Sequence, residues 1–157
     1  MKVVFRVVGR TQDSYLQEGI QVFAKRLPHY LPFELDVIPD LRKTKGLTPD
    51  QFKQREGEAI LQRLDPADQL ILLDEAGKSF TSEEFANWID RRLQQSARRL
   101  VFQVGGAYGF SSEVYQRAHA KVALSSMSFS HQMVRLFFLE QLYRAMTILR
   151  NEPYHNR

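Results

Sequence analysis

Apolar stretches alternate with amphipathic stretches along the whole 157-residue chain, and this alternation constrains the fold more than any other feature. Strand-like apolar stretches occupy 2–8, 33–38, 69–73, 100–104 and 121–124. Helical periodicity follows each of them, over 14–27, 48–64, 81–93, 111–118 and 131–150. Such alternation predicts an α/β fold with a parallel-rich sheet and helices on both faces. No linker or repeat divides the chain, so we expect one domain over 1–157.

Local signals refine this prediction. Ser14 with Gln17, and Thr81 with Glu84, have capping-box spacing, and Thr48 followed by Pro49 is typical of a helix start. Polar residues alternate with apolar ones over 33–38, which favours an edge strand. Residues 74–80 are expected to form a loop.

The composition excludes several kinds of chemistry. The chain has no Cys, which rules out thiol catalysis, Cys-ligated zinc and iron–sulfur clusters, and it has no HExxH spacing. No metal site is therefore expected. The absence of Cys fits a reducing compartment, so we expect a cytoplasmic protein. No stretch of 18 apolar residues occurs without a charge, so no membrane span is expected.

Charge is distributed unevenly. Residues 1–90 hold 12 basic and 15 acidic residues, whereas 91–157 hold 10 basic and 3 acidic ones, so the two parts carry −3 and +7. This asymmetry indicates either a polyanion partner for the C-terminal part or a solvated surface rich in Arg. The basic segment LRKTKG at 41–46 is interpreted as an ordinary mobile surface loop unless RNA is independently implied.

Glycines follow the strand at 100–104. Gly105, Gly106 and Gly109 have GGxxG spacing, which matches a dinucleotide fingerprint poorly, but their position at the end of a buried strand favours a ligand site. The segment 124–129, LSSMSF, also follows a strand. Residues 77–79, GKS, resemble the end of a phosphate-binding loop, but the position of its first glycine is Leu72.

Basic and aromatic residues near the C-terminus are further candidates. His131 precedes Arg135 by one helical turn, so the two side chains could address one anion. The tail carries Tyr154, His155 and Arg157, which together could hold a base and a phosphate. The last helix is apolar on more than one face, which predicts packing against a second protomer in a homodimer.

Five segments in order resemble the SPOUT superfamily of RNA methyltransferases, and the resemblance spans the full chain. They are LLDEAGKSFTSEEFA at 72–86, VGGAYGF at 104–110, LSSMSFSHQMVR at 124–135, EQLYRA at 140–145 and EPYH at 152–155.

The resemblance implies a SPOUT-type α/β fold with a deep trefoil knot in its C-terminal part, a homodimer, and S-adenosyl-L-methionine bound by the knot loops. It implies cofactor contacts at Leu73, Gly105, Gly106, Leu124, Ser125, Ser126, Met127, Ser128 and Phe129. The implied reaction is methylation at N3 of a pseudouridine in helix 69 of 23S ribosomal RNA, on the assembled ribosome.

Within that reaction, Arg135 is expected to fix a phosphate or the base carbonyl, Tyr154 to stack on the base and His155 to accept a proton. His131, Arg135, Tyr154 and Arg157 are expected to contact RNA. Two positions depart from the family pattern, Ser130 in place of Pro and the additional Asn156.

Three other functions stay open on the sequence. The chain could be a SPOUT methyltransferase of another RNA base, a ribosome-binding factor without catalysis, or, on the GKS segment alone, a nucleotide hydrolase.

Overall fold

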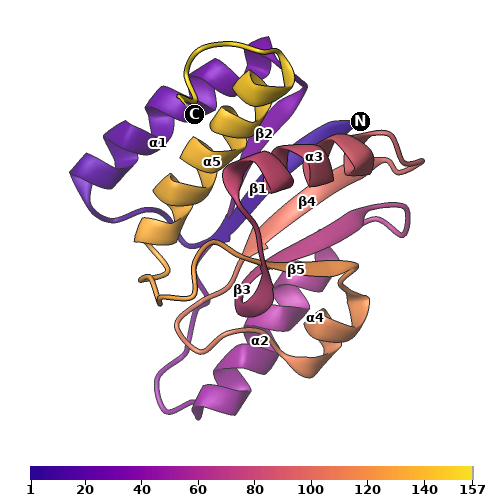
Figure 1. Cartoon of the computed structure of the whole chain (residues 1–157). Coiled ribbons are helices and arrows are strands. Elements are labelled where there is room, and N and C mark those ends of the chain that lie inside the picture. Colours follow the sequence, from indigo (N-terminus) through magenta and orange to yellow (C-terminus); the bar gives the residue numbers. More distant parts are fainter. Residues whose placement is uncertain (157) are drawn as a thin grey trace.

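The five strands run parallel in one sheet with the order β2-β1-β4-β3-β5, as seen in a computed structural model that describes residues 1–156 (Figure 1). The strands are β1 (Lys2–Val8), β2 (Phe33–Ile38), β3 (Gln69–Ser79), β4 (Arg99–Val104) and β5 (Ala120–Ala123). The helices are α1 (Ser14–Arg26), α2 (Pro49–Gln62), α3 (Ser82–Leu93), α4 (Ser112–Arg117) and α5 (Met133–Leu149), with a short 3₁₀ turn at Leu27–His29. The predicted α/β class and parallel sheet are confirmed.

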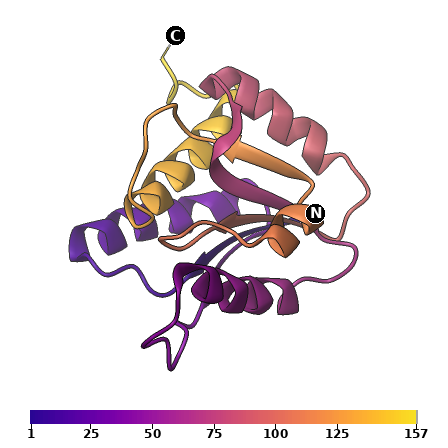
Figure 2. The same ribbon diagram turned by 90° about the horizontal axis from the view of Figure 1, so that it is seen from below.

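Helices cover both faces of the sheet, as Figure 2 shows. Alternate residues of each strand point to opposite faces, so Phe5 and Phe102 pack with α1, α3 and α5, whereas Val4 and Val101 pack with α2 and α4. Phe138 of α5 stacks on Phe5, with 4.9 Å between the ring centroids. The core is therefore two apolar layers separated by the sheet.

All three helices begin where predicted, and side-chain capping is confirmed at two of them. Thr48 and Thr81 each accept a hydrogen bond from the backbone N–H three residues on, and the reciprocal side-chain bond completes a capping box at both. The capping box predicted at Ser14 is not formed, although α1 begins at that residue. Asp13 precedes α1 without a side-chain cap, because the Gln17 amide donates instead to the carbonyl of Thr11 (2.6 Å).

β3 is longer than the sequence predicts. It pairs with β5 through Leu73 and again through Lys78, and both of these residues stand opposite Val122. Residues 74–77 bulge out between the two pairings. A Cβ on Gly77 would lie 2.6 Å from the backbone of Lys121 and Val122, so only glycine fits there. The expected loop over 74–80 is therefore mostly strand.

β2 lies at the sheet edge, as predicted, but its polar residues form ion pairs with β1. Lys2 pairs with Glu34 (2.5 Å), and the buried Arg6 pairs with Asp36 (2.6 Å). These pairs join directly opposed or neighbouring positions of the parallel ladder.

The apolar surface of α5 is largely covered within one chain. α5 packs against α1, α3 and the sheet, and Gly19 of α1 lets Leu136 approach closely. Met133 and Phe137 stay exposed, and Phe137 contacts the exposed Phe129 ring (5.1 Å between centroids). The patch left for a second protomer is thus smaller than the sequence suggests.

Most arginines of the C-terminal part have partners inside the molecule. Arg99 pairs with the buried Asp68 (2.6 Å), and Arg144 pairs with Glu140 (3.0 Å). The Arg117 guanidinium donates to the carbonyl groups of Asp65 and Asp68. The positive excess of residues 91–157 is therefore not a measure of free surface charge.

Candidate functional site

A cavity of about 490 Å³ opens where the strands end, and we call this end of the sheet the carboxyl edge. Two loops form much of it: the glycine loop (105–110), which follows β4, and the serine loop (124–131), which follows β5. The end of β3 supplies a further wall. Parallel α/β sheets bind ligands at this end of their strands, because successive loops meet there.

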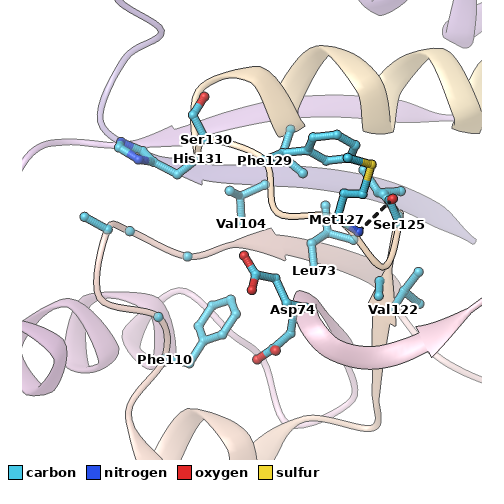
Figure 3. Close-up of a pocket in the computed structure, with 18 of the residues that line it drawn as sticks. Leu73, Asp74, Val104, Phe110, Val122, Ser125, Met127, Phe129, Ser130 and His131 are labelled. Carbon is cyan, nitrogen blue, oxygen red and sulfur yellow. Dashed lines mark hydrogen bonds between the residues drawn. The ribbon is translucent and has the colours of Figure 1, made fainter.

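Most residues that the sequence singled out as cofactor contacts line this cavity (Figure 3). They are Leu73, Gly105, Gly106, Leu124, Ser125, Met127 and Phe129. Ser126 and Ser128 belong to the same serine loop but are exposed and not among the lining residues. The Ser125 hydroxyl accepts a hydrogen bond from the Met127 N–H (3.0 Å), which fixes the turn between them.

The glycine loop owes its glycines to contacts within the chain. A Cβ on Gly105 would lie 3.1 Å from the Phe110 ring, and one on Gly106 would lie 2.4 Å from the Glu56 carboxylate. Gly109 has a φ of +82°, a left-handed backbone conformation that glycine adopts without a steric cost. These contacts hold the backbone close to the cavity.

Glu56 anchors the glycine loop from the other face of the sheet. Its carboxylate accepts a hydrogen bond from the Gly106 N–H (2.9 Å), and its side chain is buried. Burial raises the pKa of Glu56 above its ordinary value, although the Gly106 hydrogen bond opposes this shift. No motif in the sequence pointed to this residue.

An acidic wall of the cavity also escaped the sequence analysis. Asp74 accepts hydrogen bonds from the Tyr115 hydroxyl and from the Ala76 N–H (2.8 Å), and Glu75 lies beside it. Burial, together with the hydrogen bond to Asp74, raises the pKa of Tyr115 to about 12, so the phenol stays neutral. This wall offers negative charge without a basic partner for Asp74 among residues 1–156.

Arg135 is buried, which contradicts the expectation that it faces an external anion. Its guanidinium donates to the carbonyl groups of Val8 (2.9 Å) and Gly9 (2.7 Å) and to the Thr11 hydroxyl (3.2 Å). Its Nε donates to the His131 carbonyl (3.2 Å). Because these contacts use its donors, Arg135 ties the end of β1 to the start of α5.

His131 lines the cavity and is exposed at its rim. Burial of the ring and the nearby Arg135 guanidinium lower the pKa of His131. The lower pKa favours the neutral imidazole, which offers a hydrogen-bonding group at the rim of the cavity.

The C-terminal tail packs beside α5 and does not line this cavity. The Tyr154 ring contacts Tyr143 and the Arg144 guanidinium, and its hydroxyl donates to Glu140 (3.1 Å). His155 lies between Arg144 (2.9 Å) and Glu83 (3.2 Å). The predicted RNA contact Arg157 lies outside the described residues.

A second cavity of about 480 Å³ lies on the side nearest the tail. Glu140, the hydrogen-bond partner of Tyr154, lines it together with Phe80 and Phe137. Leu124 and Phe129 line both cavities, so the serine loop separates them.

The structure contradicts the interpretation of residues 77–79 as the end of a phosphate-binding loop. Gly77, Lys78 and Ser79 lie in the second half of β3, where Lys78 and Ser79 pair with β5, so they do not form a phosphate-binding loop. Over residues 1–156, no cluster of three His, Asp or Glu side chains is arranged to hold a metal ion. Within the same residues, no helix is both long and apolar enough to cross a membrane.

Comparison with known proteins agrees with the fold. Residues 1–155 match the family described as "Predicted SPOUT methyltransferase". The chain therefore belongs to the SPOUT methyltransferase family.

Individual relatives are similar over their full length. A protein of Cytophaga hutchinsonii is 54% identical over 156 residues, covering 99% of this chain and 100% of that protein. Proteins of Parabacteroides distasonis and Christiangramia forsetii are 53% and 52% identical and cover at least 99% of both chains. All three are named "Ribosomal RNA large subunit methyltransferase H".

Proposed function

We propose that this protein transfers a methyl group from S-adenosyl-L-methionine to N3 of a pseudouridine in helix 69 of 23S ribosomal RNA, on the assembled ribosome. The observation that carries the proposal is identity above 50%, over the full length, to relatives named as methyltransferases of the large-subunit RNA. Further support comes from the first cavity, where residues expected to contact the cofactor come together.

The first cavity fits the methyl donor. Leu73, Met127 and Phe129 offer apolar walls, and the glycine loop brings backbone close to the ligand space. The Asp74 carboxylate suits a cationic ligand. Ser126 and Ser128 would contribute through the backbone of the serine loop. S-adenosyl-L-methionine supplies an activated sulfonium methyl when it is bound.

The reaction requires the side chains mainly to position the base and the methyl donor. In-line transfer needs the base nitrogen about 3 to 3.5 Å from the methyl carbon. With the donor bound, the cavity walls would hold it in one orientation and exclude water from one side. The base would give its imino proton to a nearby acceptor or to water as it takes the methyl group.

Each candidate residue has a role in this proposal. Arg135 acts as a positioning residue, because it ties the carbonyl group of the cavity-lining His131 to that of Gly9 at the end of β1. His131 donates or accepts a hydrogen bond at the rim. Tyr154 stacks on the base and His155 accepts the proton, reaching the substrate from the side of the second cavity; Arg157 contacts phosphate.

We further infer a homodimer that uses the exposed patch of Phe129, Met133 and Phe137. Light scattering at micromolar concentration tests this, and a monomeric mass contradicts it. The deep trefoil knot, the single domain over 1–157 and the cytoplasmic location stay predictions.

Transfer of a labelled methyl group tests the proposed function. Assembled ribosomes, free subunits and naked rRNA, all lacking native methylation, are incubated with the protein and labelled S-adenosyl-L-methionine. The helix 69 fragment is then analysed by mass spectrometry. We expect label at the one pseudouridine and on assembled ribosomes only.

Other outcomes point elsewhere. Label on another base would favour a SPOUT methyltransferase of different specificity. Ribosome binding without cofactor binding would favour a non-catalytic ribosome-binding factor. His155→Ala with methylation at the parent rate would remove His155 from the mechanism.

A further inference from the structure

The basic loop (41–46) differs from the other basic segments of the chain. Arg42, Lys43 and Lys45 are all exposed, and none has an acidic partner within the part of the chain that the structure describes. Other exposed cations without an acidic partner, such as Lys25, Arg91 and Lys121, lie on helices and strands. The basic loop, by contrast, places three free positive charges within four consecutive residues.

The basic loop has a fixed shape. The Arg55 guanidinium of α2 donates to the carbonyl groups of Arg42 (2.7 Å) and Lys43 (3.1 Å). Lys43 has a φ of +57°, a conformation that costs energy for a residue with a side chain. The tether from Arg55 holds this conformation, and it leaves the three basic side chains free to point outward.

The basic loop also lies at the carboxyl edge. It follows β2, and both ribbon views show it extending beyond α2 (Figures 1 and 2). Phe52 of α2 packs edge-on against Tyr108 of the glycine loop, with 5.5 Å between the rings. Tyr108 is 53% exposed. Helix α2 therefore contacts the basic loop through Arg55 and the glycine loop through Phe52, so one helix links the basic loop to a loop of the first cavity.

We propose that the basic loop is an RNA-binding element that grips the phosphodiester backbone of the ribosomal RNA near the methylated base. This inference rests on the proposed function for the identity of the RNA. Unpaired Arg and Lys side chains neutralise phosphates and release counterions, and exposed Tyr108 can stack on an unpaired base. Because the loop is already ordered, binding costs less conformational entropy.

The first test removes charge from the basic loop and from a matched site. The loop variant is Arg42→Gln/Lys45→Gln, which leaves the backbone at Lys43 unchanged. The control variant is Lys25→Gln/Arg91→Gln, which removes two exposed charges from the last turns of α1 and α3. Co-sedimentation with assembled ribosomes at graded KCl concentrations gives the affinity, and titration calorimetry gives the affinity for S-adenosyl-L-methionine.

We expect the loop variant to bind ribosomes about tenfold more weakly than the control variant, with unchanged cofactor affinity. The slope of log affinity against log salt should become shallower by about one for each phosphate that the variant no longer neutralises. Equal ribosome affinities of the two variants would overturn the proposal. So would a wild-type protein that does not bind ribosomes.

Methyl transfer by the wild-type protein is measured separately, so that failure of the proposed function can be told apart from failure of the RNA-binding proposal. Wild-type protein that binds ribosomes through the basic loop but transfers no methyl group would refute the enzymatic assignment and leave the RNA-binding element in place.

A second variant tests the fixed shape of the loop. Arg55→Lys keeps the charge but cannot span both carbonyl groups as the guanidinium does. We expect ribosome affinity to fall about threefold while the salt slope stays the same. Unchanged affinity would show that the tether from Arg55 does not contribute to binding.

Discussion

Where the strands begin, Asp65 and Asp68 form ion pairs with Arg98 and Arg99, whereas where the strands end, Arg42, Lys43 and Lys45 have no acidic partner among residues 1–156. The ion pairs join the starts of β3 and β4, and Arg117 adds hydrogen bonds to the main-chain carbonyl groups of Asp65 and Asp68. The basic loop, by contrast, is exposed to solvent. Residues of the same charge therefore stabilise the fold at one edge and are available for ligands at the other.

The largest effect that tests this comparison is expected at Asp68. Its side chain is fully buried and accepts from Arg99 and from the Asp65 N–H (2.8 Å). Asp68→Ala leaves Arg99 without this partner, so we expect a loss of about 3 kcal/mol in the free energy of unfolding. Urea unfolding measures it.

The control for Asp68 is Asp50→Ala, which removes a carboxylate that is 94% exposed and should cost less than about 0.5 kcal/mol. Burial opposes ionisation of Asp68, but the Arg99 and Asp65 hydrogen bonds outweigh it and lower the pKa of Asp68. The stabilisation is therefore present above the unfolded-state pKa of about 3.9 and is lost as the pH falls through the lower folded-state pKa. A wild-type advantage that persisted in strong acid would contradict this assignment.

A slightly smaller loss in the free energy of unfolding is expected at Arg135, which lies at the carboxyl edge but stabilises the fold. Arg135→Met leaves the carbonyl groups of Val8 and Gly9 without their donor, and we expect a cost of about 2 kcal/mol. Cofactor affinity should fall with it, because the His131 carbonyl is released. Arg135→Lys should restore part of both. A variant with normal stability but no ribosome binding would instead indicate direct RNA contact.

Gly77→Ala should have a moderate effect, about 1 to 3 kcal/mol, because the added Cβ meets backbone of β5 and not a movable side chain. Thermal unfolding measures the loss, and cofactor binding reports on the displaced wall. Gly46→Ala is the matched control: its φ is +84°, but nothing lies within 4 Å of the added Cβ. Gly77 has no positive φ, so a negligible cost there would mean that the backbone of β5 moves aside for the added Cβ.

The smallest change in the free energy of unfolding is expected at Glu56. Burial raises its pKa, so the ionised carboxylate reduces stability at any pH above its unfolded-state pKa. Glu56→Gln keeps an acceptor for the Gly106 N–H and should raise the free energy of unfolding by about 1 kcal/mol or less at neutral pH. The gain should vanish as the pH falls below about 4. A gain that did not change with pH would contradict the role of ionisation.

The strands and helices could be predicted because their apolar periodicity reflects which face is buried. Leu73, Gly105 and Leu124 could be placed near one another because parallel strands end at the same edge. The second half of β3 could not be predicted, because residues 74–79 are mostly polar and their pairing depends on contact with β5.

Contacts between residues that lie far apart in the sequence could not be predicted either. An Arg in a helix pattern is usually solvated, yet Arg135 reaches carbonyl groups of residues more than a hundred positions away. The charge asymmetry was misleading for the same reason, since Asp68 of the acidic part neutralises Arg99 of the basic part. Glu56 gave no signal because its partner is a backbone N–H across the sheet.

The bulge at residues 74–77 has a consequence for how this chain can vary. β3 is paired with β5 on both sides of it, and Val122 is the partner of both Leu73 and Lys78. A one-residue slip of either pairing would reverse the inward and outward side chains of that half of the strand, so only the unpaired residues 74–77 can absorb an insertion or deletion. We therefore expect any natural change of length in this wall of the cavity to be confined to the bulge.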